Sequence, residues 1–366
     1  MQYRISDNIF FVFNNHNLIL WDYKYHQQYE LEKEYLEYLL TVNKMNYIEI
    51  KEFNQIEADL IENKILVPVQ KECQSEWKLG TIAKIFHIGT SSIPKKYSTF
   101  SKEEFSDNYI SYCNTINDKL DVYFEYERES EYRFQLPEPK LNLLDHSKLV
   151  DSLLDRKTVR EFIDETLSLD KLSKLLYLSF GYIHCDNEAL DGITIKGKRK
   201  SCPSGGNLHP TQAYIMINNV ENIEPGIYHY NAAKHSLDFI NKNMSDSELS
   251  CMIDGQYFSK NSSINVFLTT RFELSAWKYP VSRTYRVSLI DLGHLSQTFN
   301  LLCIGLGINC WITGAFNDEK IHNLLKINPN NESALFFLAA GKSTGNSIPQ
   351  EFISSINKLS IDENTR

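Results

Sequence analysis

The order of hydrophobic and polar residues divides the chain into an N-terminal part, up to about residue 72, and a longer C-terminal part. Near the start, two apolar runs, Ile9–Phe13 and Asn17–Trp21, flank the polar residues Asn14–His16. Two short apolar segments joined by a polar turn predict a β-hairpin. Apolar residues then recur at helical spacing between Leu31 and Val42, which predicts an amphipathic helix.

A second helical segment, from about residue 50 to residue 62, leads into Lys64–Val69, which we expect to be a closing strand. Pro68 lacks an amide hydrogen and therefore suits a sheet edge. Together these elements predict a winged-helix-like module in residues 1–72. Such a module is either a small packing domain or a peptide-docking module, because an open strand edge can accept an extended peptide.

Residues 73–140 give a mixed signal. One helix is possible around 79–86, and Asp121–Phe134 alternates aromatic and charged residues. That alternation is typical of a solvated face, and a docking surface for a basic peptide is the alternative. Leu136–Lys140 contains two prolines and is typical of a linker. We therefore expect a mixed helical and linker region here, followed by a last domain in 141–366.

The last domain alternates helix and strand patterns. Leu169–Phe180 carries leucines at helical spacing, with Ser168 as the expected N-cap and Gly181 as the stop. A long apolar helix is expected over 288–307, as a buried core helix or a dimer helix. Its stripe comprises Leu289, Leu292, Ser296, Phe299, Leu302, Cys303 and Leu306. The predicted strands are Ala213–Asn218, a hairpin of Gly226–Asn231 and Ser236–Ile240, Ile264–Phe272, Asn309–Phe316 and Ala334–Gly341.

Composition narrows the class of protein. The 366 residues are 42% hydrophobic, which is enough for a sizeable core in two or three domains. A net charge of −9 argues against nucleic acid as the main partner. The seven cysteines are scattered and form no CxxC pair, which predicts reduced thiols in a cytoplasmic protein and no metal site. We find no signal-peptide pattern and no apolar run of membrane-spanning length, so we expect no membrane association.

A basic cluster opens the last domain. Arg156, Lys157, Thr158 and Arg160 combine cations with a hydroxyl, a set that suits a phosphate group. Such a cluster is more often a solvated face, which is the alternative. Lys342 follows a predicted strand in "AAGKS" and could supply a second phosphate contact.

The segment Arg199–Tyr214, "RKSCPSGGNLHPTQAY", is the second candidate. Ser204 offers a hydroxyl, and Gly205 and Gly206 allow the backbone to approach a ligand closely. The alternative is a tight turn before a strand.

Taken in order, the motifs "DRKTVREF", "PSGGNLHPT", "WKYPVSRTYR", "TGAF" and "AAGK" resemble those of the nitroreductase superfamily, in particular its SagB/McbC-type dehydrogenases. The resemblance runs from about residue 145 to residue 343, and more loosely into the N-terminal module. It implies an α+β fold with a mixed or antiparallel sheet, flanking helices and a long core helix that forms a dimer. It also implies FMN and the oxidation of peptide thiazolines and oxazolines to thiazoles and oxazoles. Asn207 and Gln212 depart from the common family residues without removing a residue that the cofactor needs.

The resemblance also implies a role for each motif. Arg156, Lys157, Thr158 and Arg160 would hold the ribityl phosphate and the pyrimidine edge of FMN, and Lys342 would add to the phosphate site. Ser204, Gly205, Gly206 and Asn207 would line the isoalloxazine, while Thr313 and Gly314 would lie over the ring.

Lys278 and Tyr279 would be the catalytic pair, with the lysine as general base. The same dipeptide occurs at Lys24–Tyr25 and Lys96–Tyr97, but only Lys278–Tyr279 lies at the family position. The implied partners are a ribosomally made precursor peptide, cyclodehydratase subunits and a second copy of the chain. Two alternatives remain open: a flavin-dependent reductase of dehydroamino acids, nitro compounds or quinones, and a non-catalytic peptide-binding scaffold.

Overall fold

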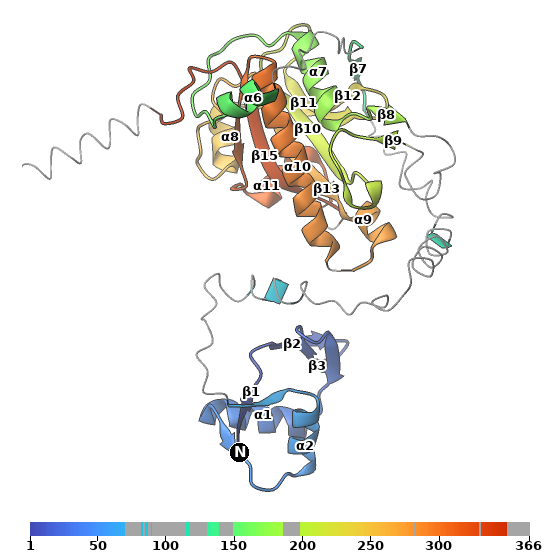
Figure 1. Ribbon diagram of the computed structural model, residues 1–366, viewed down its shortest axis with the longest axis vertical. Coiled ribbons are helices and arrows are strands. Elements are labelled where there is room, and N and C mark those ends of the chain that lie inside the picture. Colours follow the sequence, from blue (N-terminus) through green and yellow to red (C-terminus); the bar gives the residue numbers. More distant parts are fainter. Residues whose placement is uncertain are drawn as a thin grey trace, which may run out of the picture. The chain divides into compact units, whose positions relative to one another are not determined.

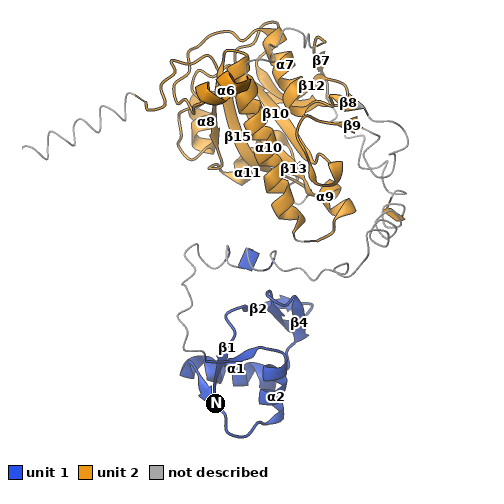
Figure 2. Ribbon diagram, in the orientation of Figure 1, with its two compact units in different colours: residues 1–99 blue, residues 100–366 orange. Residues whose placement is uncertain are grey.

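The computed structural model describes residues 1–69, 130–138, 149–185, 198–281, 283–328 and 331–349, together with residues 82, 85–86, 89 and 115–116. The chain separates into two compact units, residues 1–99 and residues 100–366, which Figure 2 draws in different colours. Most of the segment predicted as mixed lies outside the described residues, and of the possible helix at 79–86 only residues 82, 85 and 86 are described, all three as helical.

The smaller unit contains two three-stranded sheets and two helices. Its elements are β1 (Gln2–Ile5), β2 (Ile9–Asn14), β3 (Asn17–Asp22), β4 (Gln27–Glu30), α1 (Lys33–Met45), β5 (Ile48–Glu49), α2 (Gln55–Glu62) and β6 (Leu66–Pro68). The predicted hairpin is present as β2 and β3, and Asn15 and His16 at its turn both adopt positive φ. Pro68 lies in an edge strand, as expected, because the sheet order is β5-β1-β6. The sequence patterns missed β1, β4 and β5, which are short and lack a clear alternation.

The larger unit is built on a seven-stranded sheet in the order β14-β15-β13-β10-β11-β12-β7, and all its strand pairs are antiparallel (Figure 1). The strands are β7 (Arg133–Gln135), β10 (Thr211–Ile217), β11 (Gly226–Asn231), β12 (Ser236–Lys242), β13 (Ile264–Arg271), β14 (Asn309–Thr313) and β15 (Glu332–Gly341). All the strands predicted in this domain are therefore present. A separate ribbon pairs β8 (His184–Cys185) with β9 (Lys198–Arg199).

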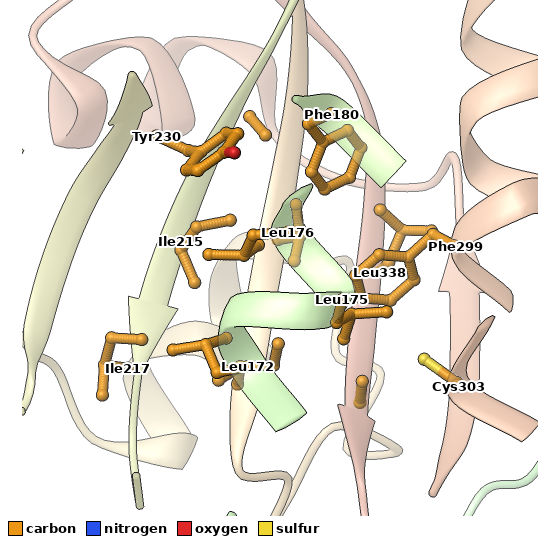
Figure 3. Close-up of a cluster of buried hydrophobic side chains, with 14 of the residues drawn as sticks. Leu172, Leu175, Leu176, Phe180, Ile215, Ile217, Tyr230, Phe299, Cys303 and Leu338 are labelled. Carbon is orange, nitrogen blue, oxygen red and sulfur yellow. The ribbon is translucent and has the colours of Figure 1, made fainter. Parts of the chain in front are cut away.

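Helices cover both faces of this sheet. They are α6 (Leu149–Asp155), α7 (Leu169–Phe180), α8 (Asp246–Met252), α9 (Phe272–Lys278), α10 (Thr284–Gly305) and α11 (Asp318–Leu325). On one face, leucines of α7 and residues of α10 pack against Ile215, Ile217 and Leu338 (Figure 3). On the other, α8 and α11 pack against Tyr214, Met216 and Phe267. Side chains alternate across β10 because successive strand residues point to opposite faces.

The long helix α10 corrects one detail of the predicted stripe. Leu292, Phe299 and Cys303 are buried against the sheet, but Leu289 is 43% exposed. Ile290 beside it is 56% exposed, so the helix is apolar on an outward face as well. Because apolar residues occur on both faces of α10, the sequence alone does not show which face packs against the sheet and which faces outward.

The predicted linker at 136–140 also differs from expectation where it is described. β7 pairs with the edge of β12, and Arg133 forms an ion pair with the fully buried Asp238. Leu136 is buried, and the Pro137 carbonyl accepts a hydrogen bond from Ser173 at 2.6 Å. These residues therefore belong to the sheet of the larger unit.

Candidate functional site

The glycine segment forms a tight loop before β10. Residues Gly205–Asn207 make one 3-10 turn, called η4, in which Gly206 has φ of 62° and Asn207 has φ of 57°. His209 follows with φ of 49°. Left-handed backbone is costly for residues with a β-carbon, and runs of it are typical of functional sites.

A buried carboxylate on α10 holds the start of this loop. Asp291 accepts a hydrogen bond from the Ser204 hydroxyl at 2.6 Å and a longer one from the Gly205 amide at 3.3 Å. The same Ser204 oxygen accepts from the His209 amide at 3.0 Å. The predicted ligand-facing hydroxyl of Ser204 therefore donates within the protein. No sequence pattern pointed to Asp291, which lies 87 residues after Ser204 in the chain.

The predicted catalytic pair meets the loop at Gly206. Lys278 ends α9, is only 2% exposed and directs its Nζ to the Gly206 carbonyl oxygen at 3.4 Å. A β-carbon built on Gly206 would lie 2.7 Å from the hydroxyl oxygen of Tyr279, so that side chain packs directly on the glycine. A β-carbon on Gly205 would lie 2.4 Å from Val287. Both glycines are thus required by the packing of the protein itself.

A second buried lysine, Lys200, lies close to His209 of the loop, and the sequence patterns missed it. Lys200 is 7% exposed, and its Nζ lies 5.3 Å from the centre of the Tyr182 ring. Burial lowers the pKa of Lys200 to about 8, with a smaller opposing effect from Cys202. Burial, together with the charge of Lys200, lowers the pKa of His209 to about 3. His209 is therefore neutral at physiological pH, and its Nε2 contacts Asn207 Oδ1 at 2.8 Å.

The basic cluster lies beside the segment that follows β15. The Ile163 amide donates to the Lys342 carbonyl at 2.8 Å, and Thr158 bridges to Cys310 of β14. Lys157 Nζ lies 3.4 Å from the position of a β-carbon on Gly345. The two predicted phosphate segments are therefore side by side, with the side chains of Lys157 and Lys342 exposed.

Arg160 differs from the other members of the cluster. Its guanidinium donates to the Ser347 carbonyl at 2.6 Å and lies 5.6 Å from the centre of the Phe258 ring. This side chain holds the segment after Lys342 in place. Lys157, Lys342 and Arg156 remain as the cations better placed to meet a phosphate.

The predicted site residues fall into two groups within one chain. Thr313 and Gly314 lie at the opposite end of the five-residue strand β14 from the basic cluster. The glycine loop and Lys278 lie farther away, at the Thr211 end of β10, whereas Lys342 follows the sheet end that aligns with Ile217. Six residue steps of strand span ~20 Å. The structure thus brings the glycine loop together with the catalytic pair, but not with the basic cluster.

Neither a metal site nor a membrane span is evident where the chain is described. Within the described ranges, no three histidine, cysteine, aspartate or glutamate side chains gather closely enough to hold a metal ion. The helices of the same residues are all too short or too polar to cross a bilayer.

Comparison with known proteins identifies the architecture. Residues 153–342 match the model of the nitroreductase family. The chain is 28% identical over 193 residues to "Putative nitroreductase MJ1384" of Methanocaldococcus jannaschii, covering 53% of this chain and 89% of that protein. It is 31% identical over 175 residues to the trifolitoxin-processing protein TfxB of Rhizobium leguminosarum bv. trifolii, and the match covers 46% of each protein. The chain thus spans less than half the length of TfxB.

A solved structure, the E. coli microcin synthetase McbBCD complex with truncated pro-MccB17 bound, aligns with a TM-score of 0.43 at 17% identity. That alignment covers 72% of this chain and 92% of the matched chain. The nitroreductase resemblance and fold predicted from the motifs are confirmed by the family match.

Proposed function

Because the chain belongs to the nitroreductase family, we propose that it is an FMN-dependent dehydrogenase that oxidises thiazoline or oxazoline rings in a ribosomally made peptide. The single observation that carries the proposal is the convergence of Lys278 and Tyr279 on Gly206. The similarity to a trifolitoxin-processing protein supports a peptide substrate.

The residues of the site fit FMN. Lys157, Lys342 and Arg156 offer cations for the phosphate, and Gly206 is a half-exposed backbone position that contacts the buried Lys278. FMN held by these residues would supply the two-electron oxidising chemistry, as the acceptor for a hydride from one ring carbon of the azoline. The protein must remove a proton from the neighbouring carbon so that the new double bond can form. Lys278 is placed to take that proton, and Tyr279 orients the ring.

Mass spectrometry tests this function. The precursor peptide, first cyclised by its cyclodehydratase, is incubated with the protein and FMN. We expect each azoline ring to lose two hydrogen atoms. Reduction of a nitro compound or quinone at a comparable rate, with unchanged azolines, would instead favour the flavin reductase alternative. A preparation that takes up no FMN would favour the scaffold alternative.

The first prediction concerns the phosphate. Lys342→Ala or Arg156→Ala should each weaken FMN binding about ten- to hundred-fold, because a hydrogen bond to a charged group contributes about 1.5–3 kcal/mol. Lys326→Ala is the matched control, since this lysine ends α11 and lies in neither predicted phosphate segment. Fluorescence titration with FMN measures the affinity. Unchanged FMN affinity in both variants would show that Lys342 and Arg156 do not bind the phosphate.

The separation of the two residue groups supports a site completed by a second copy. Asp291 of α10 holds the glycine loop, and Gly305 of the same helix lies beside Ser152 of α6. These two residues are 14 positions apart on α10, a distance of ~21 Å. The short ribityl chain of FMN cannot cover that distance. A partner copy that presents its glycine loop to this chain's basic cluster would close the site, and the exposed apolar face of α10 offers a contact surface.

The second prediction therefore concerns the oligomer. Ile290→Asp, which places a charge on the exposed face of α10, should convert a dimer into the 42.6 kDa monomer and lower FMN affinity at least about tenfold. Light scattering and flavin titration measure the two effects together. A wild-type protein that is monomeric with FMN bound would contradict the proposal. Leu40→Asp, in the other unit, is the control and should leave the dimer intact.

The smaller unit is proposed to dock the peptide. A groove of about 440 Å³ lies between β2 and α1, lined among others by Ile9, Phe11 and Leu40. β2 is an edge strand with Phe11, Val12 and Phe13 exposed, a surface on which an extended peptide can pair.

The third prediction follows from this groove. Leu40→Asp should raise the KM for a full-length precursor about tenfold or more, because it replaces an apolar side chain that lines the groove with a charged one. The turnover of a short peptide that carries only the azoline should not change. Ile290→Asp, which lies in the other unit, is the control here and should leave the affinity for the full-length precursor unchanged. An equal loss on both substrates would show that the groove does not act in docking.

A further inference from the structure

The backbone amides of the glycine loop have acceptors within the described part of the protein, with one exception. The Gly205 amide donates to Asp291, and the His209 amide donates to the Ser204 hydroxyl oxygen. The amides of Asn207 and Leu208 donate to the carbonyls of Ser204 and Gly205 at 3.0 and 3.3 Å. Among loop residues 205–209, all of which the structure describes, the Gly206 amide is the one that keeps no acceptor.

The Gly206 amide lies at the centre of the candidate site. The carbonyl of the same residue accepts from Lys278, and its α-carbon is covered by Tyr279. Gly206 is half-exposed, so a backbone donor left over in this turn can donate to a ligand. The turn keeps this arrangement only while its first two residues are held.

We propose that Asp291 is a positioning residue: its carboxylate holds Ser204 and Gly205 so that the Gly206 amide stays available to the bound ligand. This inference rests on the proposed function, in which that ligand is FMN. Asp291 is 4% exposed, and its hydrogen bonds reach both of the first two loop residues. It lies one position after Ile290, so the same helix turn carries the proposed dimer face and the anchor of the loop.

Burying the charged carboxylate of Asp291 lowers the stability of the fold. A positioning role and a purely structural role therefore predict different effects on stability when Asp291 is replaced. Burial raises the pKa of Asp291 above 3.8, although the donors Ser204 and Gly205 and the nearby His294 oppose that shift. As the pH rises above 3.8, the unfolded chain ionises first, so ionisation favours unfolding until the folded group ionises as well. At neutral pH the ionised carboxylate is therefore less favourable for folding than the protonated carboxyl group would be.

The experiment uses two amide signals that can be labelled uniquely. Of the 15 glycines, only Gly205 follows a serine and only Gly206 follows a glycine. Carbonyl-¹³C serine or glycine combined with ¹⁵N-glycine therefore selects each amide in the full-length protein. Without FMN, the Gly205 signal should shift with pH as Asp291 ionises, and titration with FMN should shift the Gly206 signal.

Asp291→Asn completes the test. We expect thermal stability at pH 7 equal to or above that of the wild type, loss of the pH titration at Gly205, and FMN affinity at least about tenfold weaker. Ser296→Ala is the matched control, since its hydroxyl bonds within α10, and it should change none of these. FMN affinity within twofold of wild type, or a Gly205 signal that does not titrate in the wild type, would overturn the proposal. If the wild type bound no FMN, the proposed function would fail, while the Gly205 titration would still decide whether Asp291 holds the loop.

Discussion

Replacing Lys278 by alanine should remove most turnover on a thiazoline peptide while bound flavin and quaternary structure persist. The amine is buried and donates to the Gly206 carbonyl, in the loop that the proposal places against the flavin. General base catalysis is typically worth about 10²–10⁴-fold in rate, and we expect a loss in that range. The measurement is single-turnover reduction of the bound flavin by a thiazoline peptide, followed by absorbance.

The chain offers a close control for this variant. Lys24 also precedes a tyrosine and lies 5.3 Å from its ring centre, as Lys278 lies 5.8 Å from the ring centre of Tyr279. Lys24→Ala should leave the rate of flavin reduction unchanged. Tyr279→Phe should lose less than Lys278→Ala if the hydroxyl only orients the ring, and as much if it relays the proton. A wild-type rate in Lys278→Ala would show that another group takes the proton, and Lys200 would then be the next residue to replace.

The sheet could be predicted from the sequence because its strands are strongly patterned. Runs such as Ile264–Phe272 and Ala334–Gly341 are apolar, bounded by polar residues, and short enough to be strands. Short or partly polar elements escaped prediction, among them β1 and β9, since two to four residues carry little periodicity. Leu289 was placed in the core stripe because α10 is apolar on nearly every face, and only packing shows which face meets the sheet.

The sequence identified residues of the candidate site, but it predicted their contacts less well. The glycines were expected to lie against a flat ring, yet each already faces a side chain of the protein, Val287 or Tyr279. Ser204 was expected to donate to the ligand, but its hydroxyl donates to Asp291. Asp291 and Lys200 were missed because burial and long-range contacts leave no local pattern in a single sequence. Motif order therefore predicted candidate residues, and the fold shows which of them lie together and how their hydrogen bonds are distributed.

Gly206→Ala should disrupt the candidate site through both backbone strain and a collision with Tyr279. At φ of 62° an alanine costs about 1–2 kcal/mol in backbone strain. Its β-carbon would also lie 2.7 Å from the Tyr279 hydroxyl oxygen. The phenol would therefore have to move away from Gly206, which Lys278 also contacts. We expect a lower melting temperature together with loss of most azoline oxidation.

Gly307→Ala separates the two causes, because Gly307 has a similar φ of 72° but open space around its α-carbon. It should show the strain alone, a melting temperature lower by roughly 2–4 °C per kcal/mol, with activity retained. Adding Tyr279→Ala to Gly206→Ala should recover the part of the stability loss that comes from the collision, without restoring turnover. If Gly206→Ala and Gly307→Ala were equally stable and equally active, the contact between Tyr279 and the loop would have no role in the site, since strain alone would then account for both variants.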